Sequence, residues 1–189
     1  MGKDLFYLQE NIARGDQKAL KDLYTLFYKK LLQFAYALVR SKELSEEVVE
    51  DVFIKLWNKR DQIGEIQNLK VYLYVATKNT ALNYLSRKAA ELTTAPFDYL
   101  EINLEALEDS PEELMITAEM LKVMQAAVDA LPPRCKMIFK LIREDGLRYK
   151  EVADILNISV NTIDVQMAIA VKRISASLPV KISIKGKSR

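Results

Sequence analysis

Residues 149–178 read YKEVADIL (149–156), NISV (157–160) and NTIDVQMAIAVKRISASL (161–178). The first stretch has the apolar spacing of a short amphipathic helix, the second carries turn residues, and the third has the spacing of a longer helix. Asp145, Gly146 and Leu147 predict a turn before them, and small Ala153 stands where two helices must approach each other. A short helix, a four-residue turn and a longer helix are typical of a helix-turn-helix, which places its second helix in the DNA major groove.

At about 100° per residue, the last of these helices separates into two faces. The predicted inward face consists of Ile163, Met167, Ala170, Val171, Ile174 and Leu178. The predicted exposed face consists of Thr162, Val165, Gln166, Ile169, Lys172 and Arg173. On such a face an amide can hydrogen-bond a base edge, aliphatic groups can touch thymine methyls, and basic groups can hold phosphates. We expect Asp164 to lie off this face.

Helical periodicity continues upstream, and no stretch alternates with period two for long enough to predict a sheet. Residues 20–38 form an apolar stripe expected to be core, and further helices are predicted over 45–63, 69–88, 110–130 and 134–143. Ser45 with two following glutamates, and Ser110 followed by Pro111, suit helix N-termini. The predicted fold is all-α, with two small helical domains, 1–90 and 111–189, joined by an acidic linker over 91–110.

Two predicted helices carry candidate binding faces. The helix over 45–63 buries its apolar half and presents another half made of Glu47, Glu50, Asp51, Ile54, Lys55 and Asn58. Ile54 among these polar groups fits a partner surface, and it equally fits a singly exposed isoleucine.

The helix over 69–88 has sides that differ in kind. One side is apolar and consists of Val71, Tyr74, Val75, Ala81, Leu82 and Leu85. The other side carries Tyr72, Asn79, Asn83 and Arg87. An aromatic ring, two amides and a guanidinium can stack on and hydrogen-bond unpaired bases, although an ordinary polar helix face has the same composition.

Charge is segregated along the chain although its net value is only +2. Residues 54–90 carry 7 basic and 2 acidic side chains, residues 91–121 carry 0 and 9, and residues 122–189 carry 13 and 6. Two basic blocks that flank an acidic bridge indicate two modules facing nucleic acid, joined by a segment that avoids it, and solvated surfaces give the same pattern.

Composition weighs against several function classes. The 189 residues include no histidine, one cysteine (Cys135) and five glycines, so the usual groups for zinc sites, nucleophilic catalysis and phosphate loops are scarce. We predict a protein that is not an enzyme and needs no metal or cofactor. The lone cysteine, the lack of an apolar run of about 20 residues and the lack of a signal sequence predict a cytoplasmic protein without membrane insertion.

Over about residues 20–178 the chain resembles the small RNA polymerase sigma factors of the extracytoplasmic-function (ECF) group, especially versions common in Bacteroidetes. One block is EDVFIKLW (50–57) followed by VYLY (71–74) and NTALNYL (79–85), which is similar to the promoter-melting domain of that family. The other is LPPR (131–134) through GLRYKEVA (146–153) and VNTIDVQM (160–167), which is similar to the family's helix-turn-helix domain.

The resemblance implies a protein that brings core RNA polymerase to promoters and assists their opening. Its implied polymerase contacts are the beta-prime clamp helices and the beta flap, with the first reached by the helix that contains Asp51. The loop from about Asp61 to Asn68, with Asn79 and Asn83, would capture an extruded base of the minus-ten element. The last helix would read the minus-35 element, and Arg148 and Lys150 belong to the same predicted DNA surface. A separate anti-sigma factor is expected as the regulator.

The sequence departs from the family pattern at three positions. Glu50 stands where many members have glutamine, and Asp164 and Gln166 stand where many have basic residues, which leaves the promoter sequence open. Two other classes also remain compatible with the residues themselves. One is a dimeric repressor or response-regulator output module that uses the same helix-turn-helix, and the other is a helical adaptor that binds no DNA.

Overall fold

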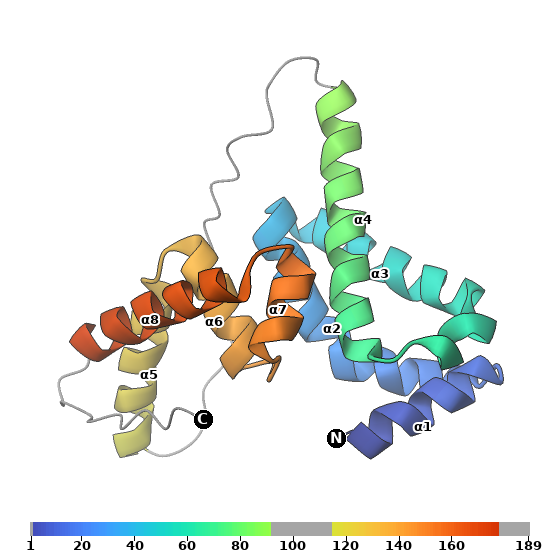
Figure 1. The fold of residues 1–189 in the computed structure, drawn as a ribbon, viewed down its shortest axis with the longest axis horizontal. Helices are drawn as coiled ribbons and strands as arrows, with labels where there is room; N and C mark the ends of the chain where they lie inside the picture. Colours follow the sequence, from blue (N-terminus) through green and yellow to red (C-terminus); the bar gives the residue numbers. More distant parts are fainter. Residues whose placement is uncertain (1, 92–114, 178–189) are drawn as a thin grey trace. The chain divides into compact units, whose positions relative to one another are not determined.

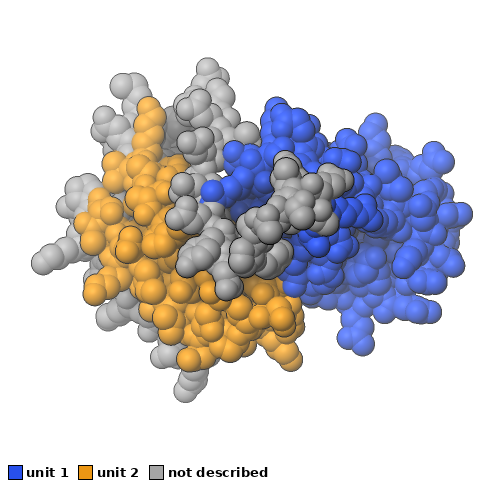
Figure 2. Space-filling view, turned by 90° about the horizontal axis from the view of Figure 1, so that it is seen from above, with its two compact units in different colours: residues 1–102 blue, residues 103–189 orange. Residues whose placement is uncertain are grey.

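The computed structural model describes residues 2–91 and 115–177, with side chains for residues 5–87 and 122–177. The chain divides into two compact units, residues 1–102 and 103–189, and each is described by itself (Figure 1, Figure 2). All regular elements in these described ranges are helical, which confirms the all-α prediction. The acidic linker and the predicted helix start at Ser110 lie outside the described residues apart from Glu91, and the domain limits 1–90 and 111–189 stay a prediction.

The first unit contains α1 (Gly2–Ala13), α2 (Gln17–Val39), α3 (Lys42–Asn58), the short 3₁₀ helix η1 (Arg60–Glu65) and α4 (Leu69–Glu91). Helix α2 contacts α1, α3 and α4, and α3 also packs against α4 (Figure 1). Four residues from the predicted stripe are buried at its centre: Leu23, Phe27, Leu31 and Phe34. The Phe34 ring meets Tyr74 of α4 edge-on, with 5.3 Å between ring centroids.

The limits of α3 differ from the prediction at both ends. The helix begins at Lys42 because the Ser41 side chain accepts a hydrogen bond from the Leu44 backbone N–H at 3.2 Å. Ser45 is buried within the helix, where its hydroxyl donates to the Ser41 carbonyl. A serine bonded in this way resembles a capping serine in sequence, although its hydroxyl is satisfied inside the helix. The helix ends at Asn58, and η1 continues to Glu65.

The structure adds α1, which the sequence did not predict. Ile12 of α1 is fully buried, whereas Phe6 and Tyr7 are 62% and 68% exposed. Because apolar residues lie on both faces, the helical spacing of this segment is blurred.

The apolar stripe of α4 also differs from the prediction. Its buried residues are Leu69, Leu73, Tyr74, Thr77, Thr80 and Ala81, while Val71, Val75, Leu82 and Leu85 are only half-buried. Burial of Thr77 is possible because its hydroxyl donates to the Leu73 carbonyl at 2.8 Å.

The second unit contains α5 (Met115–Asp129), α6 (Pro133–Arg143), α7 (Tyr149–Leu156) and α8 (Val160–Ser177). Helix α8 contacts α5, α6 and α7. The predicted limits of α7 are confirmed, and α6 and α8 begin within two residues of their predicted starts. An apolar cluster at the centre contains Val128, Leu131, Cys135 and Ala170, with Phe139, Ile169 and Ile174 packed against it.

A buried ion pair joins α5 to α6 beside this cluster. The Lys136 side chain is 2% exposed, and its Nζ lies 2.5 Å from Oδ1 of Asp129, whose side chain is 29% exposed. Gln125 donates a second hydrogen bond to Asp129 at 3.1 Å. Burial alone would raise the pKa of Asp129, but the hydrogen bonds from Lys136 and Gln125 and the lysine charges outweigh it and hold that pKa below its usual value.

Candidate nucleic-acid interface

The outer face of α3 is charged and carries one large apolar side chain. Ile54 is 56% exposed, as predicted, and Glu50 and Asn58 are exposed on either side of it. Glu47 is exposed and Asp51 is half-buried on the border that faces α4. An exposed isoleucine between the acidic Glu50 and the polar Asn58 can bury apolar area against a partner whose own surface is basic.

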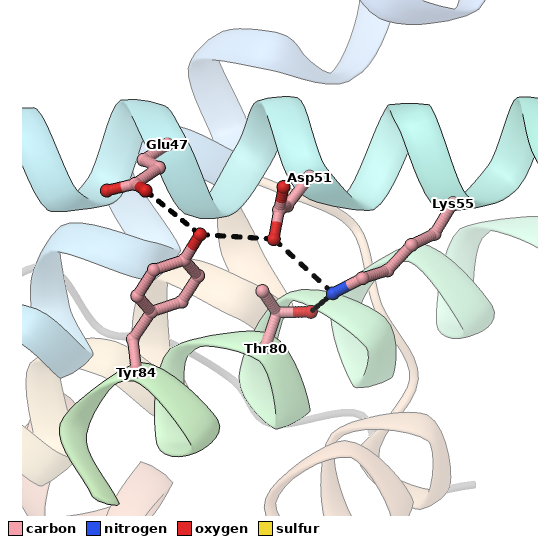
Figure 3. A network of polar contacts seen from close by, with 5 residues as sticks. All are labelled: Glu47, Asp51, Lys55, Thr80 and Tyr84. Carbon is pink, nitrogen blue, oxygen red and sulfur yellow. Dashed lines mark hydrogen bonds and ion pairs between the residues drawn. The ribbon is translucent and has the colours of Figure 1, made fainter. Parts of the chain in front are cut away.

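Five side chains connect α3 to α4 in what we call the ladder: Glu47, Asp51, Lys55, Thr80 and Tyr84 (Figure 3). The Tyr84 hydroxyl lies 3.1 Å from Glu47 Oε1 and 3.1 Å from Asp51 Oδ2. Lys55 Nζ lies 3.5 Å from Asp51 Oδ2 and 3.5 Å from Thr80 Oγ1. Residues four apart share a helix face, so both helices present their ladder residues in line.

The ladder draws residues that were predicted to bind polymerase into contacts inside the first unit. Burial and the hydrogen bonds to Glu47 and Asp51 raise the pKa of Tyr84 to about 12, because a phenolate there would lie beside two carboxylates. Three of the six predicted polymerase-binding residues, Glu47, Asp51 and Lys55, therefore contact α4 or each other inside the unit. Sequence reasoning missed Tyr84 because it belongs to neither predicted face of α4.

The predicted strip on α4 is present on the surface. Asn79, Asn83 and Arg87 are exposed, and Tyr72 is half-buried. Asn79 and Asn83 each directly precede a ladder residue, Thr80 and Tyr84. The strip and the ladder are thus neighbouring sides of one helix.

The loop predicted to capture a base, 61–68, is anchored from α1. The Gln9 side-chain amide donates to the carbonyl oxygens of Ile63 at 2.6 Å and Ile66 at 2.8 Å. Gln9 is 8% exposed and Ile63 is 1% exposed, so both groups are removed from water. Asn68 closes the loop, since its side-chain oxygen accepts from the Val71 backbone N–H at 3.1 Å at the start of α4. Sequence reasoning missed Gln9 because it did not predict α1.

A polar hollow of about 440 Å³ lies where α1, α3 and η1 meet, and it is lined by Ala13, Arg14, Gly15, Asn58, Arg60 and Asp61. Arg60 is positioned by its own neighbours, with its guanidinium 4.9 Å from the Trp57 ring centroid and one N–H donating to the Trp57 carbonyl at 3.2 Å. Asn58, predicted to bind polymerase, therefore borders this hollow as well as the outer face of α3.

Local hydrogen bonds fix the helix-turn-helix. Gly146 has φ +65° in the turn before α7, and Asn157 has φ +56° at the end of α7, a left-handed conformation that asparagine tolerates. The Ser159 hydroxyl oxygen accepts from the Thr162 N–H at 3.1 Å and caps the start of α8. At the start of α7, the Arg148 N–H donates to the Glu151 carboxylate at 2.7 Å, while the Arg148 and Lys150 side chains are exposed.

The exposed face of α8 lies to one side of the predicted one. Val165 is 50% exposed, and Lys172 and Arg173 are exposed, as predicted. Ile169 was predicted on the exposed side, which is wrong: it is partly buried against the apolar cluster. Thr162 and Gln166 are half-buried rather than exposed.

Residue Asp164 is exposed, together with Asn161 and Ala168. Going around the wheel, these three positions continue the exposed side from Val165 and Lys172, so the expectation that Asp164 lies off this face is also wrong. The reason is that α5 and α6 cover α8 on the side of Ile169. The wheel of one helix cannot predict such a contact between helices. The Cys135 thiol adds to it by donating to the Gln166 carbonyl at 3.2 Å, and burial raises the pKa of that thiol. We call Asn161, Asp164, Val165, Ala168 and Lys172 the α8 surface.

Two findings bear on metal and membrane binding in the part of the chain that the structure describes. No group of three or more Cys, Asp and Glu side chains there is placed to hold a metal ion. No helix there is long and apolar enough to cross a membrane.

The two helical units, of which the second contains a helix-turn-helix, define the class as a DNA-binding protein. Sequence-family comparison agrees on both units, because the family described as Sigma-70 region 2 matches residues 23–91 and Sigma-70, region 4 matches residues 121–174.

Known relatives place the chain within a narrower group. The ECF RNA polymerase sigma-E factor of Escherichia coli is 30% identical over 162 residues, which cover 82% of this chain and 84% of the relative. The ECF sigma factor SigW of Bacillus subtilis is 22% identical over 160 residues, covering 82% and 86%. The chain belongs to the ECF RNA polymerase sigma factors. It directs core RNA polymerase to specific promoters and assists promoter opening at transcription initiation.

Solved structures share the fold. CnrH, in complex with the cytosolic domain of CnrY, has a TM-score of 0.54 and 19% identity, covering 90% of this chain and 94% of that chain. The sigma factor RpoE of Bartonella quintana, in complex with the anti-sigma factor NepR, has a TM-score of 0.57 and 23% identity, covering 86% and 98%.

Proposed function

We propose that three surfaces of this chain divide the work of a sigma factor. The outer face of α3, centred on Ile54, binds the beta-prime clamp helices of core polymerase. The strip on α4 (Tyr72, Asn79, Asn83 and Arg87), with the loop 61–68, captures a base of the minus-ten element. The α8 surface reads the minus-35 element, with Arg148, Lys150, Lys172 and Arg173 on phosphates, and the second unit also contacts the beta flap.

The observation that carries the proposal is the contrast between the outer faces of α3 and α4. The α3 face presents Ile54 between the exposed acidic Glu50 and the polar Asn58, a composition that repels DNA and suits a basic protein partner. The α4 face carries Asn79, Asn83 and Arg87, all exposed, which can hydrogen-bond base edges and phosphates. Adjacent helices thus face different kinds of partner.

The central experiment is transcription in vitro with purified core polymerase, using the wild-type chain and Ile54→Asp. A carboxylate at this position opposes apolar burial, so we expect core binding to fall at least tenfold, since burying an unpaired charge costs more than about 1.4 kcal/mol. Glu43→Gln is the matched control on the same helix, because Glu43 is exposed near its N-terminus. Equal core binding by both variants would contradict the α3 assignment.

The strip on α4 is tested by Asn79→Ala on two templates. We expect slower open-complex formation on duplex promoters and little change on a pre-melted template, because base capture matters only while the duplex is being opened. Equal losses on both templates would contradict the base-capture role.

The α8 surface is tested by Lys172→Ala, with Lys122→Ala as the control, since both lysines are exposed in the second unit. We expect the first to weaken promoter-dependent transcription and to leave core binding intact, because it removes a phosphate contact. Unchanged transcription would count against the α8 assignment. Nanomolar, sequence-specific binding of the isolated chain as a dimer would instead favour a repressor.

We also propose how the chain is regulated and where in the cell it works. We infer that a separate anti-sigma factor holds this chain inactive, a partner that the Bartonella quintana structure contains for its own sigma factor. The chain itself is proposed to carry no enzymatic activity and to work in the cytoplasm. The acidic linker over 91–110, with its six acidic and no basic residues, would follow polymerase channels otherwise occupied by RNA.

A further inference from the structure

We propose that Tyr84 is a positioning residue that couples polymerase binding on α3 to base capture on α4. The inference rests on the proposed roles of these two helices and goes beyond them by assigning a link between them. The ladder is the physical basis, because it joins carboxylates on the polymerase face to a hydroxyl on the DNA-facing helix (Figure 3).

The Tyr84 hydroxyl has more acceptors than it can serve. A phenolic hydroxyl donates one hydrogen, while Glu47 Oε1 and Asp51 Oδ2 both lie 3.1 Å from its oxygen. At any moment one carboxylate receives the hydrogen and the other faces a lone pair of the same oxygen. The contact is therefore two alternative hydrogen bonds rather than two simultaneous ones.

The positive charge of the ladder, on Lys55, is paired with only one of the two carboxylates. Lys55 lies 3.5 Å from Asp51, and the same ammonium lies 3.5 Å from the Thr80 hydroxyl. The ladder thus contains one lysine and two carboxylates, and the lysine pairs with Asp51 at the end of the ladder away from Glu47 (Figure 3). Glu47 is exposed and Asp51 is half-buried, so a basic side chain of a partner reaches Glu47 more readily.

Binding of a partner resolves the competition for the hydrogen. A basic group on Glu47 replaces Tyr84 as its donor, and the hydroxyl can then donate to Asp51 throughout. The contact between α3 and α4 at Tyr84 is stronger in that state, because the positive charge of the partner offsets the repulsion between the Glu47 carboxylate and the lone pairs of the hydroxyl oxygen. Binding on α3 thereby tightens the attachment of α4.

The attachment sites on α4 stand next to the residues proposed to hold DNA. Thr80 follows Asn79 and Tyr84 follows Asn83, so each contact of the ladder fixes the backbone beside one amide of the strip. Base capture depends on where these amides stand, because hydrogen bonds weaken steeply away from their preferred geometry. A tighter ladder holds the two amides in one arrangement.

The test is Tyr84→Phe in the full chain, which keeps the ring and removes the hydroxyl. The control is Tyr36→Phe, because Tyr36 is a half-buried tyrosine of α2 outside the ladder. We expect core affinity to fall about fivefold for Tyr84→Phe, the scale of one hydrogen bond to a charged group at a partly exposed site. At saturating core, open complexes on duplex promoters should form at least threefold more slowly, with little change on a pre-melted template.

A double variant separates positioning from direct contact. Because Tyr84 acts through Glu47 and Asp51, the losses in core affinity for Tyr84→Phe and Glu47→Gln should combine to less than their product. Losses that multiply, or a Tyr84→Phe variant that matches Tyr36→Phe in binding and opening, would overturn the role of Tyr84. The proposed function fails separately, if the wild-type chain does not bind core polymerase at all.

Discussion

Both units have a carboxylate–lysine pair where two helices meet, but the pair joins α5 to α6 in the second unit and lies within α3, beside α4, in the first. In the second unit, the Lys136 partner of Asp129 is 2% exposed. In the first unit, the Lys55 and Asp51 side chains are 55% and 35% exposed. A buried lysine without its partner is costly, whereas an exposed pair contributes little because water solvates both charges. The difference indicates that the α5–α6 pair stabilises its unit, while the α3–α4 ladder remains available to a partner.

The largest expected effect is on the buried pair. Asp129→Asn leaves the Lys136 ammonium buried beside a neutral amide, and we expect the second unit to lose about 3 kcal/mol of unfolding free energy. Urea titration followed by the methyl NMR signals of Ile138 and Ile163 measures it. Lys136→Met is the matched control: it removes the buried charge and leaves half-exposed Asp129 to water, so its loss should be well below that of Asp129→Asn. Equal losses would show that charge burial is not the cause.

The next largest effect on stability is expected for Gln9, whose buried side chain makes hydrogen bonds without a charge. Gln9→Ala leaves the carbonyl oxygens of Ile63 and Ile66 without the donor from α1, and we expect the first unit to lose about 2 kcal/mol. The fluorescence of Trp57, the only tryptophan, reports unfolding of that unit. Gln62→Ala, at an exposed glutamine of η1, should change little. If Gln9→Ala lost less unfolding free energy than Lys55→Ala, which removes an exposed charge, burial would not determine the relative strength of these contacts.

Lowering the pH tests the Asp129–Lys136 pair without a mutation. The folded-state pKa of Asp129 is held below its usual value, so its contribution to stability is full above the unfolded pKa, near about 4, and is lost as the pH falls through the folded pKa. The urea midpoint of the second unit should therefore fall more steeply below pH 4 in the wild type than in Asp129→Asn. Parallel curves for the two proteins would contradict the assignment of this titration to Asp129.

The smallest effect on stability is expected in the ladder. Lys55→Ala removes an exposed pair four residues apart on α3, so the first unit should lose less than about 0.5 kcal/mol, and added salt should reduce the loss further. Trp57 fluorescence in urea at low and high salt measures it. A loss above that of Gln9→Ala would reverse the ranking of exposed and buried contacts.

Much of the fold follows from local signals in the sequence. The limits of α7 were predictable because Gly146 and Asn157 mark both ends, and the apolar spacing between them is regular. The N-terminus of α3 was not, because Ser45 bonds to its own helix and has the composition of a cap. Helix α1 was missed because exposed Phe6 and Tyr7 hide its periodicity.

Among the candidate sites, those that depend on one helix could also be predicted, and those that depend on contacts between helices could not. The α4 strip was predictable because exposure of Asn79, Asn83 and Arg87 follows from the wheel of one helix. The α8 surface was displaced because α5 covers Ile169, a contact between segments far apart in sequence. Tyr84 was missed for a related reason, since its role depends on the side chains that α3 places opposite it.

Under the proposed role of residues 61–68 in base capture, their anchoring by α1 bears on the speed of promoter opening. A segment that is already ordered gives up little conformational entropy when it receives a ligand, and such preorganisation favours rapid capture. Gln9 supplies this order through two carbonyl oxygens and lies outside the strip on α4. The first dozen residues would thus set how quickly a transiently flipped base is trapped, although they read no part of the promoter sequence.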